Sequence, residues 1–327
     1  MTNPERDQYL VIAGTNKAGT TALFRYLGDH PAVAVSRYKE SRFFYRHEGD
    51  GPSDALESYR QQFLRDGSGG HVCVEASPTY LHGGRAIAQR IHQVIPECRF
   101  VFSLRNPAAR VISYYKSAYG QPEVATYGVG FGDFVTRAVA AAQVDDAELD
   151  SVSPDDRAFR QELTMSRYAG FLRQFLDAFG ADRIRVCFFD SLTTDVACLM
   201  RDLCGFAGID PAFYDDYEFR VENQTRPHRH AGLRRLAGRM NYGLEPLLNR
   251  FPSIRRAARR VYDSVNVDRS AEIPIDPDAV AQLERFFAPA NAELAEIMAS
   301  HYPGQPLPDW LKPSAATGTG SGSSAPC

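Results

Sequence analysis

Residues 9–30 of the chain read YLVIAGTNKAGTTALFRYLGDH. The first five of these residues form a short apolar run bounded by glycine, which is typical of a buried parallel strand. Helical spacing begins at residue 20, and Pro31 ends it. Between them lies a glycine-containing turn, GTNKAGTT, at residues 14–21. This order predicts an anion site, because unpaired turn amides and the dipole of the following helix both favour negative charge.

The alternation of strand and helix continues along the chain. Short apolar runs predict further strands at residues 72–75, 99–104 and 184–189. Helical spacing predicts helices at residues 85–95, after Pro107, and at 168–179, 194–205 and 278–301. We therefore expect an α/β fold with a central parallel sheet flanked by helices. Residues 121–160 lack clear periodicity, and we expect them to form a mobile segment over the sheet edge.

Length and composition limit the architecture. The 327 residues correspond to roughly two domains of about 150 residues each, or to one larger α/β domain. The motifs follow one another without a linker, so we predict one domain at residues 1–312. Residues 313–327 (PSAATGTGSGSSAPC) are of low complexity and should be a disordered tail.

Charge and cysteine usage exclude some classes of protein. The formal net charge of -3 gives no basic excess that would favour nucleic acid as a partner. The six cysteines form no CxxC pair and have no zinc-ligand spacing, which favours a reducing compartment. No apolar run approaches the 18 residues of a membrane span, so we predict a cytoplasmic protein.

The turn at residues 14–21 differs from a nucleoside triphosphate loop. That loop requires G-x-x-x-x-G-K-[ST], with lysine directly after the second glycine. Gly14 and Gly19 have this spacing, but Thr20 follows the second glycine and the lysine, Lys17, lies inside the loop. Only four of the 37 cationic side chains are lysine, which makes this one worth explaining.

A lysine inside the loop followed by Gly-Thr-Thr resembles the 5′-phosphosulfate loop of sulfotransferases that use 3′-phosphoadenosine 5′-phosphosulfate (PAPS). The resemblance implies that the loop holds the 5′-phosphate and sulfate of PAPS. Its cofactor residues would be Asn16, Lys17, Ala18, Gly19, Thr20 and Thr21.

A second motif tests this resemblance independently. Residues 104–115 read LRNPAARVISYY and follow the strand predicted at 99–104. They resemble the 3′-phosphate site of the same family, R-[DN]-P followed by R-x-x-S. The resemblance implies that Arg105 clamps the 3′-phosphate and that Ser113 donates a hydroxyl hydrogen bond to it.

Further matches resemble heparan sulfate N-deacetylase/N-sulfotransferase and 3-O-sulfotransferase domains, in a bacterial-like stand-alone form with a P-loop-like sulfotransferase fold. They are KESRFF at residues 39–44, VEASPTY at 74–80, SRY at 166–168 and NQTRPHR at 223–229. The last two imply cofactor contacts from Tyr168, Arg226 and Arg229.

Three departures from those domains concern the acceptor. Ala76 stands where the resemblance has the lysine of E-K-[ST]-P. Arg42 replaces a histidine, and Tyr45 replaces an aspartate. These changes leave the cofactor motifs intact, so we expect the chain to bind PAPS. We do not expect heparan to be its acceptor.

The chemistry assigns roles to a few side chains. Sulfuryl transfer, like phosphoryl transfer, depends on positioning and charge stabilisation, and Lys17 would stabilise the leaving phosphate without a metal. The acceptor hydroxyl must lose a proton. The resemblance implies Glu40 as the base, with a pKa raised by a partly desolvated cleft. His82 is the fallback base.

The sequence thus predicts transfer of a sulfuryl group from PAPS to a hydroxyl of a saccharide or small natural product, with an amine less favoured and 3′,5′-ADP as the product. Two alternatives remain open: a P-loop small-molecule kinase and a non-catalytic nucleotide-binding protein of the same fold. The arginines of residues 250–260 would form a solvated face or dock an acidic acceptor. The oligomeric state stays unknown.

Overall fold

The computed structural model describes residues 7–46, 51–64, 71–119, 129–220 and 273–312. Contacts between residues divide the chain into two compact units. The first consists of Met1–Arg110, Met165–Asn223 and Phe286–Cys327, and the second of Val111–Thr164 and Gln224–Arg285. The single domain at residues 1–312 stays a prediction. The tail predicted at 313–327 lies outside the described residues.

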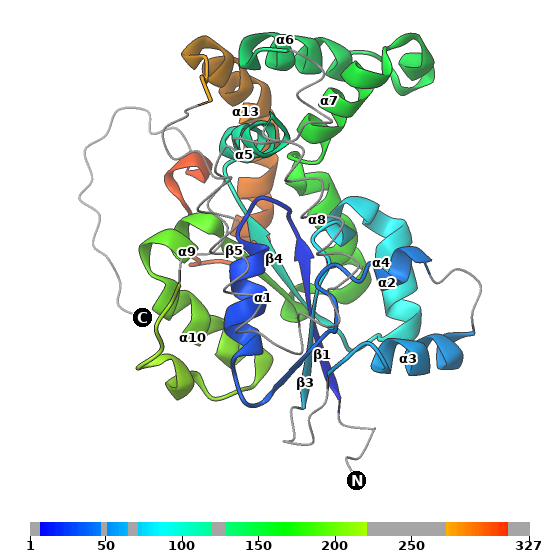
Figure 1. Ribbon diagram of the computed structural model, residues 1–327, viewed down its shortest axis with the longest axis vertical. Coiled ribbons are helices and arrows are strands. Elements are labelled where there is room, and N and C mark those ends of the chain that lie inside the picture. The colour runs from blue at the N-terminus through cyan, green and yellow to red at the C-terminus, as the bar shows by residue number, and fades with distance from the viewer. Residues whose placement is uncertain (1–6, 47–50, 65–70, 120–128, 221–272, 313–327) are drawn as a thin grey trace, which may run out of the picture. The chain divides into compact units, whose positions relative to one another are not determined.

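A parallel sheet forms the centre of the first unit, with the strand order β2-β3-β1-β4-β5 (Figure 1). Its strands are β1 (Gln8–Gly14), β2 (Val33–Val35), β3 (Val72–Ala76), β4 (Arg99–Leu104) and β5 (Ile184–Phe188). The α/β fold with a parallel sheet is confirmed, and so are the strands predicted from the apolar runs. The edge strand β2 was not predicted, because three residues are too few to show a period.

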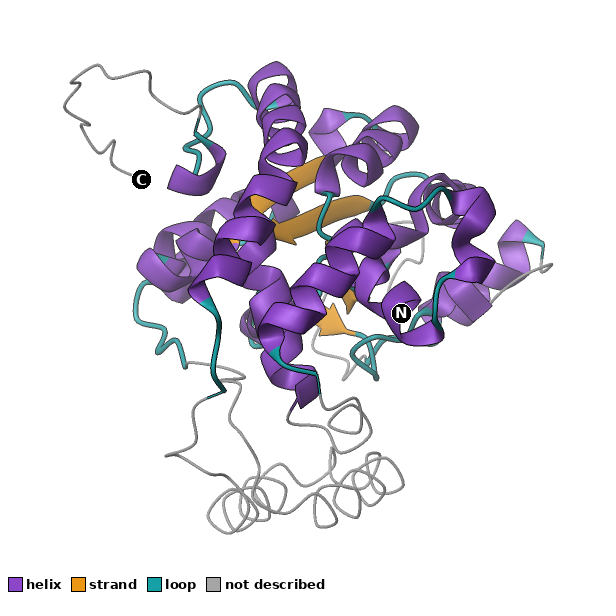
Figure 2. Ribbon diagram, turned by 90° about the horizontal axis from the view of Figure 1, so that it is seen from above, coloured by secondary structure: helices purple, strands orange, loops and turns teal. Residues whose placement is uncertain are grey.

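Helices cover both faces of the sheet, as Figure 2 shows with the strands in orange. Alternate residues of β1 point to opposite faces, so Val11 belongs to one buried core and Ile12 to the other. On the Val11 side lie α4 (Gly84–Val94) and α8 (Tyr168–Phe179), together with the end of α13 (Pro277–His301). On the Ile12 side lie α1 (Thr20–Gly28) and α10 (Val196–Ala207).

The carboxyl ends of the strands meet at one edge of the sheet, where α/β folds place their ligands. β1 is followed there by the 14–21 loop, and β4 by Arg105. Shorter elements complete this unit: α2 (Phe43–Arg46), α3 (Pro52–Arg60), η2 (Tyr80–Gly83), η5 (Ala181–Arg183), α9 (Phe189–Thr194), η6 (Pro211–Tyr214) and η7 (Asp309–Leu311).

The second unit contains α6 (Phe131–Ala142), η4 (Asp146–Ser151) and α7 (Pro154–Thr164), and α5 (Pro107–Tyr119) and α13 extend through both units. The expectation of a segment without regular structure at residues 121–160 is therefore wrong for its described part from residue 131 onward. Phe134 and Phe159 pack with ring centroids 4.8 Å apart. The pattern was hidden because α7 buries few apolar side chains along its length. Within the described ranges, no helix is long and apolar enough to cross a membrane.

Candidate functional site

The 14–21 loop is fastened to the end of β4. The Thr15 amide donates to the Ser103 carbonyl at 2.7 Å, and the Ser103 hydroxyl donates to the Ala18 carbonyl at 2.6 Å. Nη1 of Arg105 donates to the Lys17 carbonyl at 3.1 Å. The sheet thus fixes the main chain of the loop on both sides of Asn16.

The loop backbone lies in the left-handed region at two positions. Lys17 has φ 68° and Gly19 has φ 81°. For a non-glycine residue such a conformation costs on the order of 1–3 kcal/mol, and it marks functional sites more often than other places. A Cβ on Gly19 would collide with Leu192 and lie 3.2 Å from Phe189, so only glycine fits.

Helix α1 begins directly after this loop. Gly19 is its N-cap residue and supplies no side-chain cap. The first-turn amides of a helix have no intrahelical partner, and here Thr20 and Thr21 are the first two residues of that turn. The segment therefore combines such amides with a lysine and two hydroxyl residues, a composition that suits a phosphate or sulfate group.

A buried arginine, Arg110, makes a hydrogen bond to the 14–21 loop. Arg110 is fully buried, and its Nη2 donates to Oδ1 of Asn16 at 2.7 Å while its Nη1 donates to the Ser166 hydroxyl at 2.9 Å. A buried guanidinium places positive charge next to the anion site. Sequence reasoning assigned Arg110 no role, although the R-x-x-S spacing was the available signal.

Arg105 is fixed at both its main chain and its side chain. The Tyr168 hydroxyl donates to the Arg105 carbonyl at 2.9 Å, and the guanidinium carbon of Arg105 lies 4.3 Å from the centroid of the Phe189 ring. Burial lowers the pKa of Arg105, and the charge of Asp190 opposes that shift. Tyr168 is 1 % exposed, so the contact observed for this predicted cofactor residue is with Arg105.

The other predicted cofactor residues are not brought to the loop by the described contacts. Ser113 lies in the part of α5 that belongs to the second unit. Arg226 and Arg229 lie outside the described residues, as do the arginines of 250–260.

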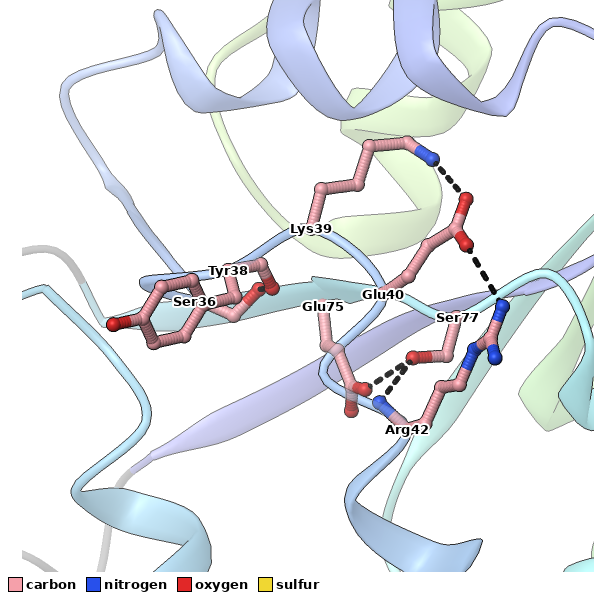
Figure 3. Close-up of polar contacts among 7 residues, drawn as sticks. All are labelled: Ser36, Tyr38, Lys39, Glu40, Arg42, Glu75 and Ser77. Carbon is pink, nitrogen blue, oxygen red and sulfur yellow. Dashed lines mark hydrogen bonds and ion pairs between the residues drawn. The ribbon is translucent and has the colours of Figure 1, made fainter. Parts of the chain in front are cut away.

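Glu40 lies between two cations at the same sheet edge (Figure 3). Lys39 Nζ donates to its Oε1 at 2.8 Å, and Arg42 Nη2 to its Oε2 at 3.4 Å. Burial raises the pKa of Glu40, but the charges and hydrogen bonds of Lys39 and Arg42 outweigh burial and hold that pKa below its ordinary value. The expected raised pKa is therefore wrong, because the sequence did not show that both neighbouring cations contact the carboxylate.

His82 contacts the loop from the segment after β3. Its Nε2 lies 3.0 Å from the Thr15 hydroxyl, and its ring packs edge-on against Phe171 with centroids 5.4 Å apart. Burial lowers the pKa of His82 to about 3, and the charge of Arg110 adds to this shift. A neutral imidazole already paired with Thr15 supports the loop, so Glu40 is the better candidate for the base.

Known proteins resemble the chain in sequence and in structure, although no protein-family model matches it. The chain is 22 % identical over 312 residues to the bifunctional heparan sulfate N-deacetylase/N-sulfotransferase 4 of Mus musculus, covering 93 % of this chain and 31 % of that protein. The chain is also 24 % identical over 327 residues to the bifunctional heparan sulfate N-deacetylase/N-sulfotransferase of Drosophila melanogaster. That alignment covers 95 % of this chain and 28 % of the Drosophila protein.

A sulfotransferase from Alicyclobacillus acidocaldarius has the same fold. The two structures superpose with a TM-score of 0.56 at 22 % identity, over 94 % of this chain and 99 % of the other. The chain is similar to sulfotransferases in sequence and in fold. It spans about a third or less of the length of its curated relatives, so the activities in their names do not pass to it directly.

The strand order explains why these residues gather where they do. Strands β3 and β4 both pair with β1, so the segments that follow the three strands are neighbours at one edge. The loop follows β1 and Arg105 follows β4, while the Glu40 amide donates to the carbonyl of Ala76 at the end of β3. Candidate donor-binding and acceptor-activating groups therefore lie on adjacent strands.

Proposed function

We propose that the chain transfers a sulfuryl group from PAPS to a hydroxyl of a saccharide or small natural product, with an amine as the less favoured acceptor. The observation that carries the proposal is Lys17. It lies inside the loop, in a left-handed conformation, with its carbonyl held by Arg105. A triphosphate loop would place its lysine one residue after Gly19 instead.

The donor would be held by the loop and by Arg105. Gly19 lets the loop pack against Leu192, which any Cβ would strike, and the first-turn amides of α1 with Thr20 and Thr21 would provide donors for the 5′-phosphate. Arg105 would hold the 3′-phosphate, since a guanidinium has five N–H donors and only one is used by the Lys17 carbonyl bond described above. Ser113, Tyr168, Arg226 and Arg229 belong to this proposal on the motif resemblance.

In the reaction the bond between sulfur and the bridging phosphate oxygen breaks, and a bond from sulfur to the acceptor oxygen forms. Lys17 would stabilise the negative charge left on that phosphate oxygen. Glu40 would accept the proton of the acceptor hydroxyl. Its lowered pKa keeps the carboxylate ionised at neutral pH, ready to accept a proton.

The acceptor surroundings differ from those that the resemblance implies. Ala76 is buried and its side chain is a methyl group, so this position supplies no cation to the site. Lys39 Nζ, 2.8 Å from Glu40, would supply that charge from another position. The side chain of Arg42 is 50 % exposed beside it, which favours an acceptor with hydrogen-bond acceptors or negative charge near the reacting hydroxyl.

The cytoplasm belongs to the proposal on the cysteine pattern of the sequence. Cys73, Cys98, Cys187 and Cys204 are buried and free, and they pack as small apolar side chains in the described cores, whereas Cys198 is disulfide-bonded and does not support a reducing compartment.

Thermal shift measurements with two ligands test the donor assignment. We expect 3′,5′-ADP to raise the melting temperature without metal, because product binding stabilises the folded state. If only Mg-ATP raised the melting temperature, the kinase alternative would be favoured instead. Transfer of radiolabelled sulfate from PAPS to a panel of hydroxylated acceptors then tests turnover, and binding of 3′,5′-ADP with no transfer to any acceptor would favour the non-catalytic alternative.

A further inference from the structure

Glu75 is a buried carboxylate with no part in the chemistry above. It is fully buried in β3, yet four hydroxyls donate to it. Tyr59 donates to Oε2 at 2.7 Å, and Oε1 accepts from Ser41 at 2.6 Å, Ser77 at 2.7 Å and Tyr80 at 3.0 Å. Burial, with the Glu75 charge adding to it, raises the pKa of both tyrosines, so their hydroxyls keep their protons and remain donors.

Two of these hydroxyls connect Glu75 to the turn that carries Glu40, and Figure 3 shows the one that belongs to Ser77. Ser41 is the residue next to Glu40, and its hydroxyl donates directly to Glu75. Ser77 donates to Glu75 and also accepts from the Arg42 amide at 3.1 Å. A third bond, from the Glu40 amide to the Ala76 carbonyl at 2.7 Å, fastens the start of the turn. Each residue of the 40–42 turn is thus tied to the end of β3.

The backbone of the turn needs such ties. Glu40 has φ 63° and Arg42 has φ 51°, and both are left-handed conformations that side chains other than glycine seldom adopt. Residues held in this region persist only where their surroundings fix them. Glu75 is the common acceptor for the hydroxyls that fix this turn, and Tyr59 of α3 holds its other oxygen.

We propose that Glu75 is a positioning residue, which sets the backbone of the 40–42 turn and thereby aims the Glu40 carboxylate. The inference rests on the proposed function, in which Glu40 takes the acceptor proton. Without the Glu75 carboxylate, the four hydroxyls no longer share two accepting oxygens, Ser41 and Ser77 are held less firmly, and the turn relaxes toward right-handed φ values. Glu40 then keeps its charge but no longer faces the acceptor.

Ser41→Ala and Tyr59→Phe form a matched pair of variants. Each removes one hydroxyl from the same carboxylate, but only Ser41 belongs to the turn. The first readout is hydrogen exchange of the Glu40 and Arg42 amides, which needs no acceptor. We expect Ser41→Ala to speed exchange of both amides about tenfold or more. In Tyr59→Phe the exchange of these amides should change no more than that of the β3 amides.

The second readout is turnover with an acceptor found for the unchanged protein. Glu75→Gln and Ser41→Ala should each lower kcat about tenfold or more with little change in KM for PAPS, and neither should lower kcat further in a Glu40→Gln background. Tyr59→Phe should keep kcat. Equal further losses in the Glu40→Gln background, or unchanged amide exchange in Ser41→Ala, would overturn the positioning role. Failure of the proposed function would look different, because 3′,5′-ADP would not bind while the amide exchange still reported on the turn.

Discussion

Nη2 of Arg110 lies 2.7 Å from Oδ1 of Asn16, so a side chain of the helix after β4 holds a side chain of the loop after β1. The guanidinium is fully buried, and its other terminal nitrogen is engaged by Ser166. The loop that precedes α1 is therefore supported by a side chain that a ligand in the loop need not touch.

Asn16→Ala should destabilise the fold, because it takes an acceptor from a buried cation. A lost hydrogen bond to a charged group is worth about 1.5–3 kcal/mol, and urea denaturation measures the change in the free energy of unfolding. Asn16→Asp keeps an oxygen facing Arg110 and should be close to neutral. Equal stability of the Ala variant and the unchanged protein would show that the contact contributes nothing.

Lys17→Ala should lower kcat by about 100- to 1000-fold while 3′,5′-ADP affinity falls only modestly, because the ammonium stabilises charge that develops in the transition state. Single-turnover kinetics and calorimetric titration measure the two quantities. Lys312→Ala is a control, since that exposed lysine pairs with Asp309. A near-normal rate in Lys17→Ala would remove the lysine from the mechanism.

Arg105→Ala should weaken 3′,5′-ADP binding about tenfold or more, as expected for a lost charged hydrogen-bond partner of a phosphate. Titration calorimetry gives the dissociation constant. Arg99→Ala is the matched control. Arg99 is the first residue of β4, at the end of the strand opposite to Arg105, and it donates to the Phe206 carbonyl. If both variants bind alike, the second motif has been misassigned.

The pH dependence of turnover should report the cations beside Glu40. Lys39 and Arg42 hold the pKa of Glu40 below 4.5, so the acid limb due to this base should lie below that pH. Lys39→Met removes a positive charge and should move the limb to higher pH. The stability contributed by this carboxylate is present above its unfolded pKa and is lost as the pH falls through its folded pKa. An unmoved limb would mean that another group is the base.

His82 should make the fold less stable in mild acid. Its folded pKa of about 3 lies below the unfolded value of about 6.5, so between these values the unfolded chain binds an extra proton. Stability then falls as the pH drops through this window, by at most about 1.4 kcal/mol per pH unit. His82→Gln should flatten that slope in urea titrations at pH 7 and pH 5, whereas His71→Gln, at an exposed position, should not.

Sequence patterns predicted the parts of the fold and site that depend on local order. The 14–21 loop lies between a strand and a helix because an apolar run precedes it and helical spacing follows, and the position of Lys17 separates it from a triphosphate loop. Arg105 was predicted from the resemblance of its segment to a 3′-phosphate motif after a strand, and Arg105 does contact the loop.

The remaining contacts of the site could not be predicted, because a single sequence does not show which distant residues come together in the fold. Glu75 and Ser41 lie 34 residues apart, and no periodicity shows that the hydroxyl of one meets the carboxylate of the other. Lys39 was overlooked for another reason. Whether adjacent side chains meet depends on the left-handed turn at Glu40, which no composition or spacing in the segment predicts.

The fastening of the loop to β4 also sets an order of events during synthesis. The hydrogen bonds from Ser103, Arg105 and Arg110 reach back 85, 88 and 94 residues to Ala18, Lys17 and Asn16. At roughly 5–20 residues per second, the ribosome needs several seconds to make the chain between the loop and these partners. The loop therefore cannot form these hydrogen bonds until several seconds after it has been synthesised. A chain stalled before residue 103 would contain the whole loop sequence without the contacts that fix its conformation.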